Sequence, residues 1–152
     1  MMFTFNASAL DGFDGVAFEK LTLDGTLLAS HEDLEDEGQT IHFPKIGTTA
    51  LDSETKDHIG KADSEVTLVD TVTYENLEPG TEYILTGTLM DKATGEALVI
   101  GDKAVTTEVT FTPEKSSGSV DVTFSFDGTT GAGKDLVAFE ELYMDSSLLA
   151  YT

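Results

Sequence analysis

The sequence predicts an all-β protein folded as an antiparallel β-sandwich, and three observations support this. Residues 66–73, 83–90 and 105–111 are rich in β-branched and aromatic side chains and mostly alternate between apolar and polar. Turn-forming sequences separate such segments at the spacing of roughly 8–12 residues that is typical of a sandwich. No segment has a long 3.6-residue hydrophobic period, so helix should be a minor component.

Each predicted strand ends in a sequence with turn chemistry. Pro and Gly set the backbone angles of tight turns, and Asn, Asp and Ser hydrogen-bond to the nearby main chain. Such breaks occur at Glu78-Pro79-Gly80, at Lys92-Ala93-Thr94-Gly95, at residues 112–118 and at residues 127–133. The chain is therefore predicted to form a succession of short strands.

Composition excludes several classes of function. The chain has 152 residues, 29 acidic residues against 8 Lys, and a formal net charge of -21, which opposes binding to nucleic acid or to an anionic membrane surface. The absence of Cys excludes disulfides, Cys-ligated metal centres and thiol catalysis. No apolar run approaches the roughly 18 residues of a membrane helix, so we expect no membrane insertion.

An internal repeat organises the chain. Three segments near the N-terminus return near the C-terminus at a constant offset of 121 residues, as Phe3 does at Phe124. They are Phe3-Thr4-Phe5-Asn6, Val16 to Leu21 and Leu27-Leu28-Ala29, which return as Phe124-Ser125-Phe126-Asp127, Val137 to Leu142 and Leu148-Leu149-Ala150. A period this long indicates an array of whole domains. We predict that residues 1–41 are the C-terminal strands of one repeat, and that residues 42–152 are the following repeat without its own last strand.

The sequence gives little support for a metal site, for a cofactor site or for an enzyme that acts on a diffusible substrate. The acidic cluster formed by His31, Glu32, Asp33, Asp36 and Glu37 lacks the alternating acids and central Gly of a calcium loop, so we interpret it as a solvated loop. His42 and His58 have no ligand-spaced partner and are interpreted as surface or linker residues. Hydrolase and P-loop motifs are missing. We expect no metal, no cofactor and no turnover of a diffusible substrate.

Two carboxyl groups fall among apolar residues. Val137 and Phe139 share one strand face, and Glu140 shares the other with Ala138. If Glu140 faces the core, burial raises its pKa and keeps it protonated near neutrality; the alternative is a strand-end Glu in solvent. Asp70 is likewise in phase with apolar neighbours two residues away on either side, so the two acids could meet.

Taken together, these segments resemble the VaFE-repeat, or Thr–Gln ester-bond, domains of Gram-positive surface adhesins. The resemblance rests on Val137-Ala138-Phe139-Glu140, on residues 43–50 and 70–83, and on His31-Glu32-Asp33 with Gln39-Thr40, which fits the family's last strand. It implies an immunoglobulin-like (CnaB-like) β-sandwich in an extracellular, cell wall-anchored stalk. Neighbouring repeats of the same protein would be its partners, and the host ligand is not specified.

The resemblance also implies a self-formed ester between a Thr hydroxyl and a Gln side chain, with release of ammonia. The implied roles are nucleophile for Thr48 (alternative Thr49), acyl donor for Gln39, base for His31, and an acidic pair of Asp70 and Glu140 (alternative Glu19). Thr48 is preferred because it shares a strand face with Ile46 and Ala50. A neutral imidazole would take the hydroxyl proton, and the paired acids would share a proton that stabilises the oxyanion.

The order of these residues along the chain leaves open whether Gln39 and Thr48 of the same molecule can react with each other. Gln39 precedes Thr48, and only eight residues separate them, whereas neighbouring parallel strands need a crossover of a dozen or more. Three outcomes remain: no bond, an internal arrangement in which residues 1–40 supply the missing tail, or head-to-tail exchange between molecules, which we favour. The alternative class is a spacer or ligand-binding sandwich without covalent chemistry.

Overall fold

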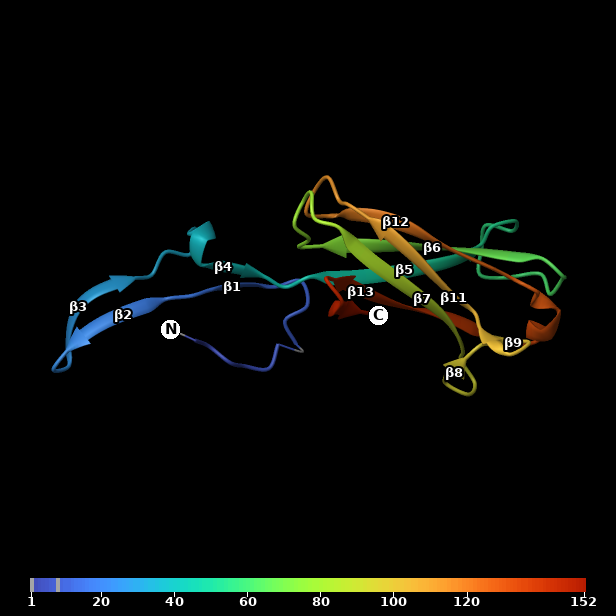
Figure 1. The fold of residues 1–152 in the computed structure, drawn as a ribbon, viewed down its shortest axis with the longest axis horizontal. Coiled ribbons are helices and arrows are strands. Elements are labelled where there is room, and N and C mark those ends of the chain that lie inside the picture. The colour runs from blue at the N-terminus through green and yellow to red at the C-terminus, as the bar shows by residue number, and fades with distance from the viewer. Residues whose placement is uncertain (1, 8) are drawn as a thin grey trace. The chain divides into compact units, whose positions relative to one another are not determined.

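The structure is a computed structural model that describes residues 2–7 and 9–152. The chain forms two compact units, Met1–Pro44 (unit 1) and Lys45–Thr152 (unit 2), each of which is described by itself (Figure 1). The division lies at Pro44, close to the predicted repeat boundary between residues 41 and 42. Whether the two units are consecutive repeats stays a prediction at this point.

Unit 1 consists of two short antiparallel strand pairs and one turn of 3₁₀ helix. Strand β1 (Asp14–Val16) pairs with β4 (Thr40–His42), β2 (Glu19–Leu23) pairs with β3 (Thr26–His31), and η1 (Glu37–Gln39) precedes β4. The leucines of the β2–β3 hairpin are more than half exposed: Leu21 62%, Leu23 61%, Leu27 53% and Leu28 56%. Within its described residues, unit 1 therefore leaves an apolar hairpin in solvent.

Unit 2 contains two antiparallel sheets that pack face to face (Figure 1). One has the order β12 (Gly118–Phe126), β6 (Val66–Glu75), β5 (Lys45–Asp52). The other has the order β11 (Thr106–Phe111), β7 (Tyr83–Asp91), β13 (Leu136–Met144), β14 (Ser147–Tyr151), with β8 (Glu96–Ala97) paired to β7. A small ribbon of β9 (Val99–Ile100) and β10 (Lys103–Ala104) and the 3₁₀ turn η2 (Gly128–Gly131) complete the unit. The prediction of an all-β antiparallel sandwich is confirmed.

The core lies between the two sheets and follows from the alternation of side chains along each strand. Along β7 every second residue from Tyr83 to Asp91 is buried, and β6 shows the same alternation from Asp70 to Tyr74. The most deeply buried apolar residues, all at most 2% exposed, are Val72, Leu77, Leu85, Leu89, Val122, Phe124 and Leu142. Apolar burial of this kind is the main stabilising term of unit 2.

One side of the sandwich is open. In the described part of unit 2, β5 pairs with β6 alone and β14 pairs with β13 alone, so each is an edge strand. Strand β5 also contacts β13 and β14, which places the two free edges on the same side. We call this side, between β5 and β14, the open seam.

No helix in the described residues is long and apolar enough to cross a membrane.

Candidate functional site

Two carboxyl groups lie inside the sandwich of unit 2. Asp70 on β6 and Glu140 on β13 are each 0% exposed, and they come from opposite sheets. Glu140 is buried because β13 turns Ala138, Glu140 and Leu142 inward and leaves Phe139 46% exposed. The alternative of a strand-end Glu140 in solvent is therefore wrong.

A glycine on the neighbouring strand makes room for this carboxyl. Gly87 on β7 pairs directly with Glu140, and a Cβ atom on Gly87 would lie 2.7 Å from Glu140 Oε1 and 2.6 Å from the ring of Phe124. Sequence reasoning missed Gly87, although a Gly inside a strand often marks close approach of another group.

Thr48 lies on β5 beside the two acids. It pairs with Val72, so its side chain shares the inner face with that fully buried residue, and Asp70 occupies the next inward position along β6. The Thr48 hydroxyl oxygen is buried, whereas Thr49 is exposed on the outer face. Of the two threonine candidates, Thr48 is therefore the one whose hydroxyl lies in the core.

The buried oxygens of these three residues lack well-formed hydrogen bonds. Thr48 Oγ1 and the four carboxyl oxygens of Asp70 and Glu140 have no partner of good geometry among the described residues. Burial, which is the largest cause, and the charge and hydrogen bonding of the adjacent Asp70 carboxyl together raise the pKa of Glu140 to about 8. A buried polar group without a partner is costly, and such costs gather at functional sites.

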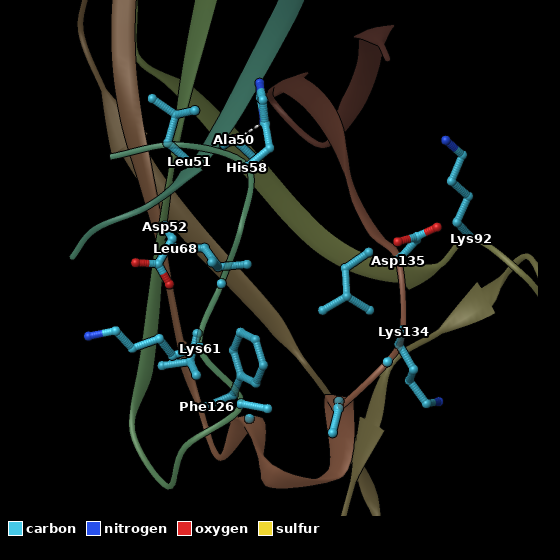
Figure 2. Close-up of a pocket in the computed structure, with 18 residues that line it drawn as sticks. Ala50, Leu51, Asp52, His58, Lys61, Leu68, Lys92, Phe126, Lys134 and Asp135 are labelled. Atoms are coloured by element: carbon cyan, nitrogen blue, oxygen red, sulfur yellow. Dashed lines mark hydrogen bonds between the residues drawn. The ribbon is translucent and has the colours of Figure 1, made fainter. Parts of the chain in front are cut away.

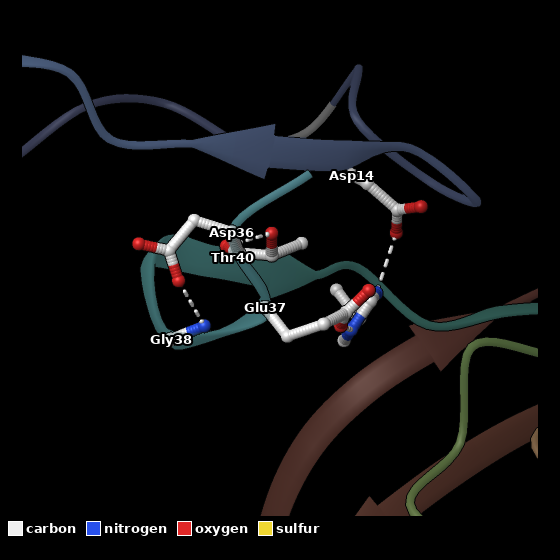
Figure 3. A network of polar contacts seen from close by, with 6 residues as sticks. Asp14, Asp36, Glu37, Gly38 and Thr40 are labelled. Carbon is white, nitrogen blue, oxygen red and sulfur yellow. Dashed lines mark hydrogen bonds and ion pairs between the residues drawn. The ribbon is translucent and has the colours of Figure 1, made fainter. Parts of the chain in front are cut away.

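Gln39 lies in unit 1, at the end of η1 and half-buried. Its main chain is fixed at both ends: its N–H donates to the Asp36 carbonyl at 3.1 Å, and its carbonyl accepts from the Ala17 N–H at 3.0 Å. The Asp36 carboxylate accepts from the Gly38 N–H at 2.8 Å, and the Thr40 hydroxyl donates to the Asp36 carbonyl at 2.8 Å (Figure 3). These bonds use the backbone of Gln39 and leave its side-chain amide outside the network.

His31 also lies in unit 1, at the end of β3 and opposite Glu19 on β2. Its ring Nε2 lies 2.9 Å from a carboxylate oxygen of Asp36, and both His31 and Glu19 are exposed. The structure thus places Thr48, Asp70 and Glu140 in unit 2 and His31 and Gln39 in unit 1. It does not gather the five predicted site residues within one unit.

The acidic segment around His31 forms turns. Asp33 and Asp36 each accept a hydrogen bond from the N–H two residues later, and these bonds order the loop. Nearby, the His42 ring lies 2.7 Å from Asp14 (Figure 3). Over residues 2–7 and 9–152, no group of three or more metal-ligating side chains comes together.

A pocket of about 460 Å³ lies at the end of unit 2 where β5 leads into its following loop (Figure 2). Two of the three lysines that line it form ion pairs, since Lys134 lies 2.8 Å from Asp91 and Lys61 lies 2.7 Å from Glu54. His58 contacts the Ala50 carbonyl through Nδ1 at 3.0 Å, which holds the loop against the outer edge of β5. The lining therefore contains no cluster of unpaired charges, and we interpret the pocket as a gap left where the loops pack together.

The fold and the buried groups define an all-β domain with a hydroxyl and two acids in its core. The sequence matches the family described as "T-Q ester bond containing domain" over residues 1–43 and again over residues 44–151. The chain therefore belongs to this family, and the resemblance seen in its sequence is confirmed.

Solved structures share the fold at low identity. Two crystal forms of a bacterial adhesin from Mobiluncus mulieris, described as containing intramolecular disulfide, isopeptide and ester bond cross-links, match with TM-scores of 0.60 and 0.61. They are 17% and 15% identical, and each match covers 72% of this chain. The chain spans about half of each adhesin, 52% and 53%. No curated protein matches the chain.

Proposed function

We propose that this chain is a stalk segment of a cell wall-anchored bacterial surface adhesin and that it forms a Thr–Gln ester cross-link without another enzyme. The bond joins the Thr48 side chain to that of Gln39. The observation that carries the proposal is the buried Thr48 hydroxyl beside two buried carboxyls, all three without well-formed partners. Membership of the ester-bond family supports it.

The reaction begins at the Thr48 hydroxyl, which is a poor nucleophile until a base takes its proton. The His31 imidazole serves as that base when Thr48 Oγ1 attacks the side-chain carbonyl carbon of Gln39. The contact between Nε2 and Asp36 orients the ring before the reaction and has to be released or exchanged for the hydroxyl. Attack forms a C–O bond and moves the carbonyl electrons onto oxygen.

The buried acids stabilise the oxyanion that results. With a pKa near 8, Glu140 is protonated at neutral pH and donates a hydrogen bond toward the developing charge. The tetrahedral intermediate then expels the amide nitrogen, which takes the proton from the base and leaves as ammonia. The ester remains in the core, so the site acts once and does not turn over.

The ester would stabilise the folded domain against mechanical force. The chain has no Cys, so it cannot use disulfides, and a covalent link between edge strands resists their separation when the stalk is pulled. Burial protects the ester because hydrolysis needs water at the carbonyl carbon. A spacer sandwich without covalent chemistry is the competing function.

Intact mass spectrometry tests the proposal. The native chain should lose the mass of one ammonia for each bond formed, and Thr48→Ala should abolish the loss. Thr49→Ala is the matched control, because Thr49 is the next residue on β5 and points to solvent. His31→Ala should slow the loss, and His58→Ala should leave its rate unchanged. An unreacted native mass, or the same ammonia deficit in Thr48→Ala as in the native chain, would contradict the proposal and favour the spacer function.

A further inference from the structure

The outer face of the sheet formed by β11, β7 and β13 carries exposed aromatic and apolar side chains. Along β13 the residues that point away from the core are Val137, Phe139, Glu141 and Tyr143, and they alternate with the buried ones. Val137 is 37% exposed and Phe139 is 46% exposed. A contiguous group of exposed apolar side chains is typical of an interaction surface.

A row of polar residues crosses this face at right angles to the strands. Glu141 on β13 pairs with Thr86 on β7, and Thr86 pairs with Glu108 on β11. Both glutamates are exposed. We call these three residues the acidic row. Because adjacent strands lie about 4.7–4.9 Å apart, the main chains at the two glutamates are separated by roughly 10 Å. One cationic side chain can therefore lie between the two carboxylates.

The two carboxylates of the acidic row have no cationic partner among the described residues. The lysines that form ion pairs there are Lys20, Lys61 and Lys134, and all of them pair with other acids. The outward positions of β7, β11 and β13 hold no Lys. The Tyr143 hydroxyl donates to Glu141 Oε2 at 3.0 Å, which holds an aromatic ring beside this carboxylate. An ionised carboxylate has further lone pairs with which to accept from a ligand.

We propose that this face of unit 2 binds an extended, Arg-containing segment of a partner protein, with an Arg guanidinium between the Glu141 and Glu108 carboxylates. The stem of that Arg lies against the rings of Phe139 and Tyr143. A guanidinium group forms paired hydrogen bonds with carboxylates and stacks on aromatic rings, whereas a Lys ammonium acts as a point charge. The inference does not depend on the ester.

The spacing along β13 favours a polypeptide as the ligand. Phe139, Glu141 and Tyr143 are two residues apart, so they follow one another at about 6.6–6.8 Å along the strand. An extended segment places every second side chain at the same interval, and its side chains can therefore match these positions in turn. A second copy of this chain does not fit, because the sequence contains no Arg and the net charge of -21 makes copies repel each other.

The internal repeat shows which part of this surface is particular to unit 2. Phe18, the repeat equivalent of Phe139, is 43% exposed in unit 1. At the position of Glu141, however, unit 1 has Lys20, whose ammonium lies 2.8 Å from Glu32. The substitution Glu141→Lys therefore gives unit 2 the residue that unit 1 already has, and it reverses the charge that the proposal needs.

Calorimetry of the whole chain with two probes, a hexa-arginine and a hexa-lysine peptide, tests the proposal. The probes carry equal charge, so attraction to net charge alone treats them alike. We expect hexa-arginine to bind roughly threefold more tightly than hexa-lysine at about 0.15 M salt. Glu141→Lys should weaken hexa-arginine binding roughly tenfold. Glu65→Lys is the matched control and should have a much smaller effect, since Glu65 is exposed and precedes β6 in the other sheet.

A second pair of variants separates the aromatic contact from charge. Phe139→Ala should remove the preference for hexa-arginine over hexa-lysine, and Glu141→Gln should weaken hexa-arginine binding in the same direction as Glu141→Lys. Circular dichroism checks that each variant is folded. Three results would each overturn the proposal: no binding of hexa-arginine, equal affinities of the native chain for the two peptides, or equal losses in Glu141→Lys and Glu65→Lys.

Discussion

The Glu140 carboxyl group combines complete burial with a raised pKa, and Gly87 provides the space that it occupies. A buried acid with a pKa near 8 is neutral over most of the physiological range and becomes charged only in mild alkali. In its neutral form the Glu140 carboxyl can donate a hydrogen bond, which an ordinary surface Glu, ionised at the same pH, cannot do.

The raised pKa predicts a pH dependence of stability before the bond forms. In Thr48→Ala, the folded state holds a proton on Glu140 that the unfolded state loses near pH 4.5. The free energy of unfolding should therefore fall as pH rises from about 5 to about 8, by on the order of a few kcal/mol. Chemical denaturation at a series of pH values measures it. In the double variant Thr48→Ala/Glu140→Gln this fall should shrink, and an unchanged slope would contradict the assignment.

Gly87 should be needed for the position of Glu140. Gly87→Ala puts a methyl group within 3 Å of the Glu140 carboxyl and of Phe124, so it should displace the carboxyl and slow ester formation at least tenfold. Gly131→Ala is the control, because a Cβ there meets nothing within 4 Å. The rate of ammonia release measures the effect. Circular dichroism separates it from unfolding, and a folded Gly87→Ala that reacts at the native rate would rule out this role.

At the scale of elements, the same sequence pattern forms a buried strand in unit 2 and an exposed strand in unit 1. Strand β13 turns Leu142 completely into the core, whereas its repeat equivalent on β2, Leu21, is 62% exposed. Alternation along the chain predicts both strands, but a strand buries its apolar face only where another sheet covers it. Unit 2 provides that sheet, and within the described residues of unit 1 nothing comparable covers β2.

The repeat therefore offers a matched pair of substitutions. Leu142→Ala removes a fully buried side chain and should lower the free energy of unfolding by about 2–5 kcal/mol. Leu21→Ala acts on an exposed side chain and should change it by less than about 0.5 kcal/mol. Denaturation of both in the Thr48→Ala background measures the difference. A comparable loss for Leu21→Ala would mean that the β2–β3 hairpin is covered in solution, for example by a second molecule.

At the scale of the whole molecule, charge opposes self-association. The net charge of -21 makes two copies repel each other, and the Debye length falls from about 30 Å at 0.01 M salt to about 8 Å at 0.15 M. Any association between copies should therefore strengthen as salt is added over this range. Light scattering of Thr48→Ala at a series of salt concentrations measures it. Association that weakens as salt is added would indicate that ion pairs between copies outweigh the repulsion from net charge.

The sequence by itself determined the class of fold and the family. Alternation and turn chemistry are local properties, so they predicted β6, β7 and β11 and the breaks between them, and the repeat showed which segments are equivalent. Alternation also placed Thr48 on the same face as Ile46 and Ala50. It could not decide whether that face was the core, since both faces of a strand have the same period.

Only the tertiary structure decided which acids are buried and which groups share a unit. Glu140 and Glu19 occupy equivalent positions in the repeat, yet one is buried and the other exposed, because burial depends on the sheet that packs above a strand. The same cause explains why Gly87 was missed: the carboxyl that it accommodates lies 53 positions away in sequence, on a strand that only pairing brings alongside. Local patterns fix the strands, and the contacts between sheets fix the chemistry.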